Sequence, residues 1–448
     1  MSWPMIQIGQ FTYVVTKGTT PTKKQGFADS GINYIKAEAL NGDSSLDLSG
    51  GFYISEDMHQ SLKRSMLEDG DVLLTIAGAN IGKCGIVEER HLPANTNQAV
   101  GIMRVDQQQV APRFLYYWFK QPQTFRYLQG LNAQAAQPNI NLSMLRNIEV
   151  PVPSISEQQR IADVISAYDD LIENNRRRIQ LLEQAARLLY KEWFVHLRFP
   201  GHEHTQIVDD VPEGWEKKVL GDLCFEVRET VSPSALEANT PYIGLEHMVS
   251  DHRAPHLAAI SPAYVREYAA PICLPQPAAP CDRLHRGPCD RIQHMPRRSI
   301  TFCEWGQAEQ VTSSKHRFRE GEILFGKIRP YFHKVGIALT DGVASSDAII
   351  IRPVHSHLLP LVLMTTSSDG FVAVTAQQMK EGSKMPRADW KQMQQYPVPL
   401  PPDGLLRAFN DFIDPILNQL KTLAFANKRL GAVRDLLLPK LMNGEVAV

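Results

Sequence analysis

The residues whose spacing first suggests chemistry are two glycines and a lysine, in the run Gly78-Ala-Asn-Ile-Gly82-Lys83-Cys84. A nucleotide-hydrolysing loop has four residues between its glycines, and a Ser or Thr after the lysine to hold Mg²⁺. Here three residues separate the glycines, Cys84 follows the lysine, and the run lies between predicted strands. These departures exclude nucleotide hydrolysis at this loop.

A second candidate for chemistry is a group of thiols and one imidazole, Cys273, Cys281, His285 and Cys289. Zinc sites usually contain pairs of cysteines separated by only two to four residues. None of these spacings is that compact, so we predict no metal site. A disulfide scaffold is not expected either, because the chain has only six cysteines in 448 residues.

The remaining residues form no catalytic constellation. The chain has neither the Asn-Pro-Pro-Tyr nor the Asp-Pro-Pro-Tyr tetrapeptide of amino-methyltransferases. Its histidines are not paired with a plausible nucleophile. A nuclease-like acid-x-lysine triplet occurs at 216–218, but such triplets arise by chance in most chains. We therefore predict a protein without catalytic residues, that is, not an enzyme.

Polar residues suited to DNA recur at equivalent places in the two halves of the chain. Asn, Gln and Arg pair bidentately with adenine and guanine edges, whereas Lys contacts phosphate. Taken singly, each is more often a solvated surface residue, but recurrence in both halves favours DNA binding by the group. The candidates are Lys17, Thr19, Lys23, Lys24, Asn80, Lys83, Asn97, Gln98, Asn139 and Asn141, followed by Lys315, Arg317, Lys327, Arg329, Tyr331, Lys334, Ser346, Lys384 and Arg387.

The two halves are equivalent because the chain is built twice. Gly-Asp-Val-Leu-Leu begins at Gly70 and Gly-Glu-Ile-Leu-Phe at Gly321, and a Lys-x-Gly-Ile run follows each at the same distance. Pro-Val-Pro at 151–153 returns at 397–399. This period exceeds the roughly 20–50 residues of solenoid repeats, so we infer duplication of a whole domain.

Short β-branched and aromatic runs predict strands in the first module, at 11–15, 71–76, 85–87 and 99–105. A helix is expected at 112–121, where several large apolar residues fall on one side. The fold class is therefore α+β, with two similar globular domains.

A long heptad pattern follows each module. Apolar residues alternate in steps of four and three from Ile161, and again from Phe409, which is typical of a coiled-coil seam. Asn175 and Asn427 each place one amide in the seam, where a partnered amide fixes register and orientation. The two helices are therefore expected to pack on each other. A long core helix of a bundle is the alternative, and Pro415 is expected to kink or restart the second helix.

These patterns predict a first module at 1–150, a helix at 151–197, a linker at 198–211, a second module at 212–396 and a second helix at 397–448. The second module contains an additional Pro- and Cys-containing stretch, 249–293. We predict that this insertion is a poorly ordered surface loop.

The composition is that of a soluble globular protein, with 43% hydrophobic and 21% charged residues. No apolar run is long enough to span a bilayer, and the N-terminus lacks a secretory signal, so we expect a cytoplasmic protein with no membrane partner. The net charge of −1 gives no overall field that attracts nucleic acid. Positive charge for DNA must then be local or supplied by a partner.

The ordered motifs resemble those of the specificity subunits of type I restriction-modification systems. The pieces that carry the resemblance are 70–74 with Gly82-Lys83, 151–161 (Pro-Val-Pro-Ser-Ile-Ser-Glu-Gln-Gln-Arg-Ile), 212–215 (Pro-Glu-Gly-Trp), 321–331 and 397–402. Each motif alone is weak, but their order, repeated twice, is specific. The resemblance covers nearly the whole chain except 249–293.

The resemblance implies that each module is a target recognition domain for one half of a split, asymmetric site in double-stranded DNA. It implies an antiparallel coiled coil with approximate two-fold symmetry. It also implies two modification subunits, which bind S-adenosylmethionine and methylate adenine, and restriction subunits that translocate with ATP and Mg²⁺. The chain itself would then need no cofactor.

Two other functions stay open from the sequence. The insertion 249–293 could make the chain an inactive or decoy specificity subunit, or the coiled coil could be a protein-binding scaffold without a DNA role. Salt-dependent binding to duplex DNA in the presence of modification subunits separates these, because a scaffold would show none.

Overall fold

A computed structural model of the chain describes residues 3–22, 27–40, 46–48, 51–78, 80–131, 139–244, 299–303, 305–308, 311–378 and 386–447. The predicted insertion with its thiols, and the candidates Lys23, Lys24 and Lys384, lie outside these residues. The chain forms two compact units. The first unit comprises Met1–Asn174 together with Asn427–Val448, and the second comprises Asn175–Ala426.

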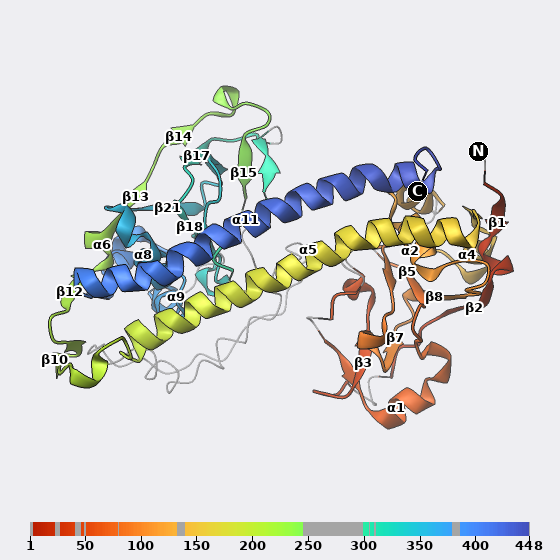
Figure 1. Cartoon of the computed structure of the whole chain (residues 1–448), viewed down its shortest axis with the longest axis horizontal. Coiled ribbons are helices and arrows are strands. Elements are labelled where there is room, and N and C mark those ends of the chain that lie inside the picture. Colours follow the sequence, from red (N-terminus) through yellow and green to blue (C-terminus); the bar gives the residue numbers. More distant parts are fainter. Residues whose placement is uncertain are drawn as a thin grey trace. The chain divides into compact units, whose positions relative to one another are not determined.

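The first unit contains a four-stranded antiparallel sheet with the order β2-β8-β5-β6 (Figure 1). Its strands are β2 (Thr12–Lys17), β5 (Val72–Thr75), β6 (Cys84–Ile86) and β8 (Val100–Val105). The four predicted strands are thus confirmed to within one or two residues. A smaller sheet has the order β4-β3-β7, in which β3 and β7 are parallel. Its strands are β3 (Ile32–Ile35), β4 (Tyr53–Ile54) and β7 (Ala94–Thr96).

Short helices cover this unit and follow from its sequence. Pro112 and Pro122 begin α2 (Pro112–Lys120) and α3 (Pro122–Gly130), at the position where the missing N–H of proline is not needed. The predicted helix at 112–121 is confirmed as α2, whose large apolar residues are buried. The other helices are α1 (Glu56–Ser61) and α4 (Leu142–Asn147), and β1 (Met5–Gln7) pairs antiparallel with β9 (Glu149–Pro151).

The second unit repeats the topology of the main sheet. Its four-stranded sheet has the order β13-β21-β18-β19, which is the order of the first unit strand for strand. Its other sheet has five strands, in the order β14-β17-β20-β15-β16, where the first unit has three. In both of these sheets one pair is parallel, β15 with β20 and β3 with β7. The bounds are β12 (Glu216–Val219), α6 (Leu220–Leu223), β13 (Cys224–Val227), β14 (Thr230–Val231), β15 (Pro241–Ile243), β16 (Gly306–Gln307), β17 (Lys315–Phe318), β18 (Ile323–Gly326), β19 (Val335–Ile337), β20 (Gly342–Ala344), β21 (Ala348–Pro353), α8 (Leu359–Thr366), α9 (Asp369–Gln377), α10 (Trp390–Met393) and β22 (Pro397–Leu400). The duplication inferred from the sequence is therefore a duplication of topology.

The repeated Gly-acid motif has a shared structural role. Gly70 and Gly321 have φ values of 83° and 84°, in the left-handed region that glycine adopts without strain. The acid that follows each glycine is buried and pairs with an arginine on the adjacent strand. Asp71 accepts a hydrogen bond from Arg104 Nε at 2.8 Å, and Glu322 accepts one from Arg352 Nε at 2.5 Å. The same ion pair therefore fixes the start of the equivalent strand in both units.

Two long helices, α5 (Ile155–Tyr190) and α11 (Asp403–Met442), contribute to both units. In the first unit, Ile161 and Ile165 of α5 share a hydrophobic cluster with Leu441 and Met442 of α11. The second unit holds the other halves of the helices. There the π-helical continuation of α5 (Lys191–Val195) carries Phe194, whose ring centroid lies 4.9 Å from the ring centroid of Phe409. The start of one helix thus packs beside the end of the other in each unit, so the helices are antiparallel.

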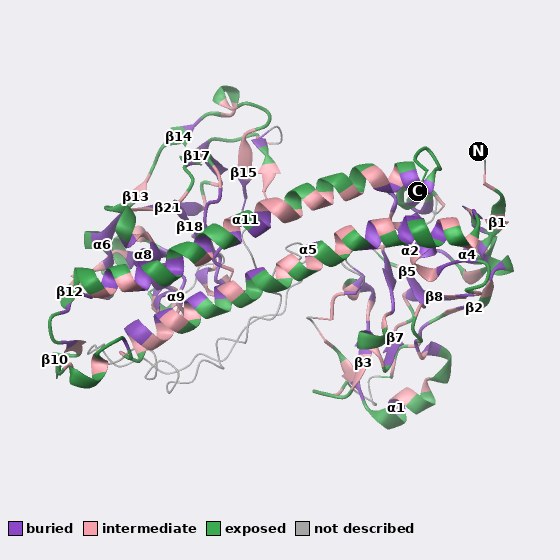
Figure 2. Cartoon of the chain, in the orientation of Figure 1, coloured by how far each residue is buried: buried purple, intermediate pink, exposed green. Residues whose placement is uncertain are grey.

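The buried positions of α5 and α11 recur with the predicted heptads (Figure 2), which confirms the predicted seam.

The helix boundaries differ from the prediction, because both Pro-Val-Pro segments contribute to strands, β9 and β22. The predicted linker contains the hairpin of β10 (Ile207–Val208) and β11 (Val211–Pro212). Of the kink or restart expected at Pro415, the restart is wrong, because α11 is one helix from Asp403 to Met442. Pro415 is exposed, as is Asp411, whose carbonyl loses its helical partner and can be hydrated.

In the first unit, a polar junction joins α2, α5 and α11. The Asp169 carboxylate lies 2.6 Å from Arg434 Nη1 and 3.3 Å from Lys120 Nζ, and it accepts a hydrogen bond from the Tyr117 hydroxyl at 3.1 Å. Burial alone would raise the pKa of Asp169, but the charges of Lys120 and Arg434 more than offset this effect and lower the pKa below its usual value.

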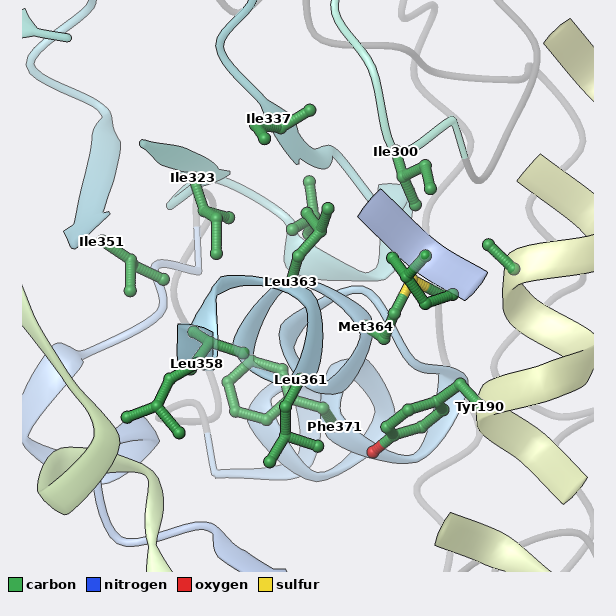
Figure 3. Packing of buried hydrophobic residues seen from close by; sticks show 14 of the residues in the cluster. Tyr190, Ile300, Ile323, Ile337, Ile351, Leu358, Leu361, Leu363, Met364 and Phe371 are labelled. Atoms are coloured by element: carbon green, nitrogen blue, oxygen red, sulfur yellow. The ribbon is translucent and has the colours of Figure 1, made fainter. Parts of the chain in front are cut away.

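The core of the second unit lies between its four-stranded sheet and helices α8 and α9. Figure 3 shows Leu361, Leu363 and Phe371 of this cluster close to sheet residues and to Tyr190 of α5.

Within the described part of the chain, no single helix is long and apolar enough to cross a bilayer. Only the bent pair Ser356–Thr366 and Asp369–Gln377 meets the length and composition together.

Candidate nucleic-acid interface

Three loop segments converge beyond the end of the main sheet in the second unit. They are the residues after β18, the turn between β20 and β21, and the residues before α10. Lys327 N–H donates to the carbonyl of Asp347 at 2.7 Å, and Ala388 N–H donates to the carbonyl of Lys327 at 2.8 Å. A hollow of about 380 Å³ lies at this point. It is lined by Glu226, Arg228, Lys327, Ser346, Asp347, Arg387, Ala388, Asp389 and Trp390.

Cations and acids alternate around this hollow. Arg387 Nη2 lies 3.1 Å from Asp347, and Arg228 Nη2 lies 2.6 Å from Glu226. The side chains of Arg387 and Arg228 are 59% and 71% exposed, and ion pairs this exposed contribute only about 0–1 kcal/mol. The acids therefore orient the guanidinium groups without holding them strongly. Each arginine keeps free donors in a planar fork that matches phosphates and guanine edges.

The same three segments converge in the first unit. Ile76 N–H donates to the carbonyl of Ala99 at 2.8 Å, and Ile140 N–H donates to the carbonyl of Ile76 at 2.8 Å. These bonds correspond one for one to those of Lys327, Asp347 and Ala388. An isolated bridge between Ala77 and Asn139 matches the one between Ile328 and Arg387. The two units therefore present equivalent loops on equivalent scaffolds.

Several predicted residues of the first unit lie on these loops. Gln98, Asn139 and Asn141 are exposed, and Asn80, Lys83 and Asn97 are half-buried. Asn141 Oδ1 accepts the N–H of Met144 at 2.8 Å, so this side chain also caps α4.

Lys17 and Thr19 adjoin the same loops. Lys17 ends β2, and Thr19 N–H donates to the carbonyl of Thr96 at 3.0 Å. Thr19 therefore lies beside the turn that carries Gln98.

In the second unit, Lys327, Ser346 and Arg387 line the hollow, and Arg329 and Tyr331 belong to the adjoining turn after β18. Arg228 was not predicted, although it directly follows β13, as Lys17 ends β2. Its signal in the sequence was only its position relative to the repeat, in a segment where the two modules share few residue types.

Three lysine and arginine candidates of the second unit are placed differently. Lys315 is buried, and its Nζ donates to the Ser313 carbonyl at 3.0 Å. Lys334 is only 4% exposed. Arg317 lies on β17 of the other sheet and pairs with Glu229 at 3.2 Å. In this conformation Lys315 and Lys334 do not present an ammonium group to a phosphate.

The described residues contain no group of three or more His, Cys, Asp or Glu side chains arranged to hold a metal ion. Cys84 and Cys224 are free thiols in the interior, and burial raises the pKa of each to about 12. Neither thiol is therefore a reactive thiolate at neutral pH.

Comparison with known proteins agrees with this geometry. The family model described as type I restriction modification DNA specificity domain matches residues 2–184. The type I restriction enzyme MjaIX specificity subunit of Methanocaldococcus jannaschii is 24% identical over 100% of this chain and 94% of its own length. The chain is thus similar over its whole length to a specificity subunit of a type I restriction enzyme, and its residues 2–184 match the specificity-domain model.

Further relatives agree. The EcoBI specificity subunit of Escherichia coli is 35% identical over 32% of this chain and 30% of its own length. A crystal structure of a type I restriction-modification S subunit from M. genitalium has the same fold, with a TM-score of 0.57 and 14% identity, over 98% of this chain and 96% of that one. These similarities support DNA sequence specificity within a type I restriction-modification system as the function of the chain.

Proposed function

We propose that each unit of this specificity subunit reads one half of a bipartite, asymmetric site in double-stranded DNA through the three converging loops. The observation that carries the proposal is that these loops share their backbone hydrogen bonds in the two units but not their side chains. Gln98 corresponds to Ser346, Asn139 to Arg387, and Ile76 to Lys327. A common scaffold with different donors and acceptors would read two different half-sites.

The proposed contacts are of two chemical kinds, contacts to base edges and contacts to phosphates. Amide and guanidinium groups suit base edges, and lysines suit phosphates. Residues 23, 24 and 384 remain predictions from the sequence, and Lys315 and Lys334 are left out because they are buried. The proposed set is Lys17, Thr19, Asn80, Lys83, Asn97, Gln98, Asn139 and Asn141 in the first unit, and Arg228, Lys327, Arg329, Tyr331, Ser346 and Arg387 in the second. Arg317 lies on β17, outside the three loops, and stays a prediction from the sequence.

We further propose that the long helices bind two modification subunits. Leu188 lies 33 residues after the first residue of α5, and Leu436 lies 33 residues after the first residue of α11. These equivalent leucines are 62% and 69% exposed, and the proposal rests on their recurrence at the same position of both helices. Because the surface occurs once in each unit, two copies of the same partner can bind. These partners, and the restriction subunits, would supply the sites for S-adenosylmethionine, ATP and Mg²⁺.

A selection experiment tests the DNA-reading proposal. The full chain, purified with the other subunits of its complex, selects bound duplexes from a randomised library at several salt concentrations. We expect a bipartite motif whose affinity falls as salt rises, because phosphate contacts release counterions. A parent protein that enriches no motif, or binds independently of salt, would contradict the proposal.

The matched variants Asn139→Ala and Arg387→Ala test whether each unit reads its own half-site. Each removes the side chain at the same position of the repeat, so each should reduce base preference in a different half of the motif. The expected loss is about ten-fold to one-hundred-fold against the wrong base, the size of a bidentate base contact. If both variants weakened the same half, the assignment of one half-site to each unit would be wrong.

The partner proposal has its own test. Leu188→Glu and Leu436→Glu should each reduce the number of modification subunits that co-purify with the chain by one. Leu171→Glu provides a comparison, because Leu171 is also exposed on α5 but lies on another face of the helix than Leu188 and corresponds to Gln419 rather than to a leucine. Unchanged stoichiometry in both variants would exclude these leucines from the interface.

A further inference from the structure

The turn between β18 and β19 contains two left-handed residues that are not glycine. Arg329 and His333 have φ values of 49° and 55°, and they flank the short helix η10 (Pro330–Phe332). Residues with a Cβ adopt this conformation at a conformational cost that glycine avoids. Such strain persists only where surrounding contacts hold it in place. It therefore points to side chains that are needed at these positions.

The equivalent turn of the first unit avoids this cost. Gly78 and Gly82 occupy the corresponding positions, with φ values of 94° and 89°. The hydrogen bond that closes the turn is also equivalent. Thr75 N–H donates to the carbonyl of Lys83 at 2.7 Å, and Gly326 N–H donates to the carbonyl of Lys334 at 2.8 Å. The two turns share a backbone shape, but only the turn of the second unit carries side chains at its left-handed positions.

The side chain of His333 connects this turn to the start of α9 through polar contacts. It is 6% exposed, and its Nε2 lies 2.7 Å from the carbonyl oxygen of Ser367. Because that oxygen only accepts, Nε2 carries the proton and donates. Its Nδ1 lies 3.6 Å from the carboxylate of Asp369, the first residue of α9. This helix is fixed in the core through Phe371 (Figure 3), so His333 links the turn to a rigid element.

The turn is joined in its other direction to the proposed DNA contacts. Arg329 N–H donates to the carbonyl of Pro386 at 3.0 Å, and Ile328 forms a bridge with Arg387. Lys327 begins the same segment and lines the hollow. Displacement of the turn would therefore move the side chains of Lys327, Arg329 and Arg387 together.

We infer that His333 is a positioning residue for DNA reading by the second unit. It does not touch DNA itself, since it is buried, but it holds the strained turn against α9 and so fixes where the three cations point. The carboxylate of Asp369 lies beside Nδ1 and attracts the imidazole when both ring nitrogens are protonated. This inference rests on the proposed function, in which those cations contact one half-site.

The test uses His333→Asn in the full chain, purified with the other subunits of its complex. Asparagine tolerates the left-handed conformation, so the backbone can stay in place, but its shorter side chain cannot reach both partners. With the randomised duplex library, we expect base preference in one half of the motif to fall by up to about ten-fold, the size expected for one lost hydrogen bond. The half that is lost should be the one weakened by Arg387→Ala, and the other half should be unchanged.

Two further variants keep the result interpretable. Asp369→Asn should weaken the same half-site by a smaller factor, and it leaves His333 in place. His355→Asn is the control, because His355 is exposed in the same unit and should change neither half. A merely structural role for His333 predicts lower binding of all duplexes with unchanged selectivity between the halves.

The outcomes separate the inference from the proposal beneath it. If the parent selects a bipartite motif and His333→Asn selects it with equal preference in both halves, the inference is wrong and the proposed function stands. Equal weakening of both halves would also overturn it. If the parent selects no motif, the proposed function fails, and the inference fails with it.

Discussion

The two halves of the paired helices reach the same packing with different chemistry. Asp169 is 14 residues after the start of α5 and Arg434 is 31 residues after the start of α11, and they form an ion pair in the first unit. The corresponding positions are Leu417 of α11 and Ala186 of α5, which share one hydrophobic cluster in the second unit. One junction is polar and the other is apolar.

The two junctions should differ in how well they tolerate substitution. Apolar contacts are non-directional and depend mainly on buried area, so the second junction accepts changes that preserve volume. A partly buried ion pair depends on both partners, since removing one leaves an uncompensated charge. We therefore expect the first junction to be sensitive to charge and pH, and the second to be sensitive to neither.

The largest expected effect comes from Asp169→Asn. This change removes the counter-charge of Arg434 and Lys120 in a partly buried site, so the free energy of unfolding of the first unit should fall by about 3 kcal/mol. Urea denaturation of the full chain measures it. Leu417→Met, at the corresponding position of the second unit, is the control and should cost less than about 1.5 kcal/mol. Equal effects at the two positions would remove the contrast between the junctions.

The pH dependence of the same contrast follows from the lowered pKa of Asp169. A folded-state pKa below the unfolded value means that ionised Asp169 stabilises the fold fully above the unfolded pKa of about 4. That contribution is lost as pH falls through the folded pKa. The stability difference between the parent and Asp169→Asn should therefore shrink from pH 6 towards pH 3. A difference that stays constant over this range would show that the charge of Asp169 is not what stabilises the junction.

A smaller effect is expected from Gly70→Ala and Gly321→Ala. These variants test a feature that the two units share, the left-handed glycine before the equivalent strand. Both glycines have positive φ, so each substitution should destabilise its own unit by about 1–2 kcal/mol. A Cβ at Gly70 would lie 3.3 Å from Pro112, whereas a Cβ at Gly321 would meet nothing within 4 Å. Gly70→Ala should therefore be the more costly of the two in thermal denaturation, and the reverse order would be unexplained by this geometry.

The smallest expected effect concerns two helix caps at matching positions. Asn141 caps α4 and Asp389 caps α10, each by accepting a backbone N–H. Substitution of either residue by alanine should cost about 1 kcal/mol of stability. If Asn141 also reads a base, Asn141→Ala should in addition lower base preference in the selection experiment. Unchanged preference would reduce its role to the cap.

Much of the architecture was predictable because it is expressed locally. The Gly-acid motifs predicted equivalent strands, and the steps of four and three from Ile161 and Phe409 predicted the seam, since both depend on residues close in sequence. The restart at Pro415 was predicted wrongly because proline was judged without its surroundings. It lies on an exposed face of α11, where water can satisfy the carbonyl that loses its partner.

The candidate site was less predictable because it depends on contacts between distant residues. Residue type alone did not distinguish Lys334, which is buried, from Lys327, which lines the hollow. The pairing of Asp169 with Arg434 joins residues 265 positions apart, so no local sequence pattern could predict this ion pair. Arg228 was missed because its equivalence to Lys17 appears only when β13 is superposed on β2 as the same strand of a repeated sheet.

The discontinuous first unit has a consequence for synthesis. Its hydrophobic core includes Leu438, Leu441 and Met442, which follow the whole second unit in the chain. Domains generally fold in order of emergence, the N-terminal one first, but this unit cannot complete its core until the second unit has been synthesised. A chain interrupted within the second unit would thus leave apolar surface of the first unit exposed, which makes it a ready substrate for chaperones and proteases.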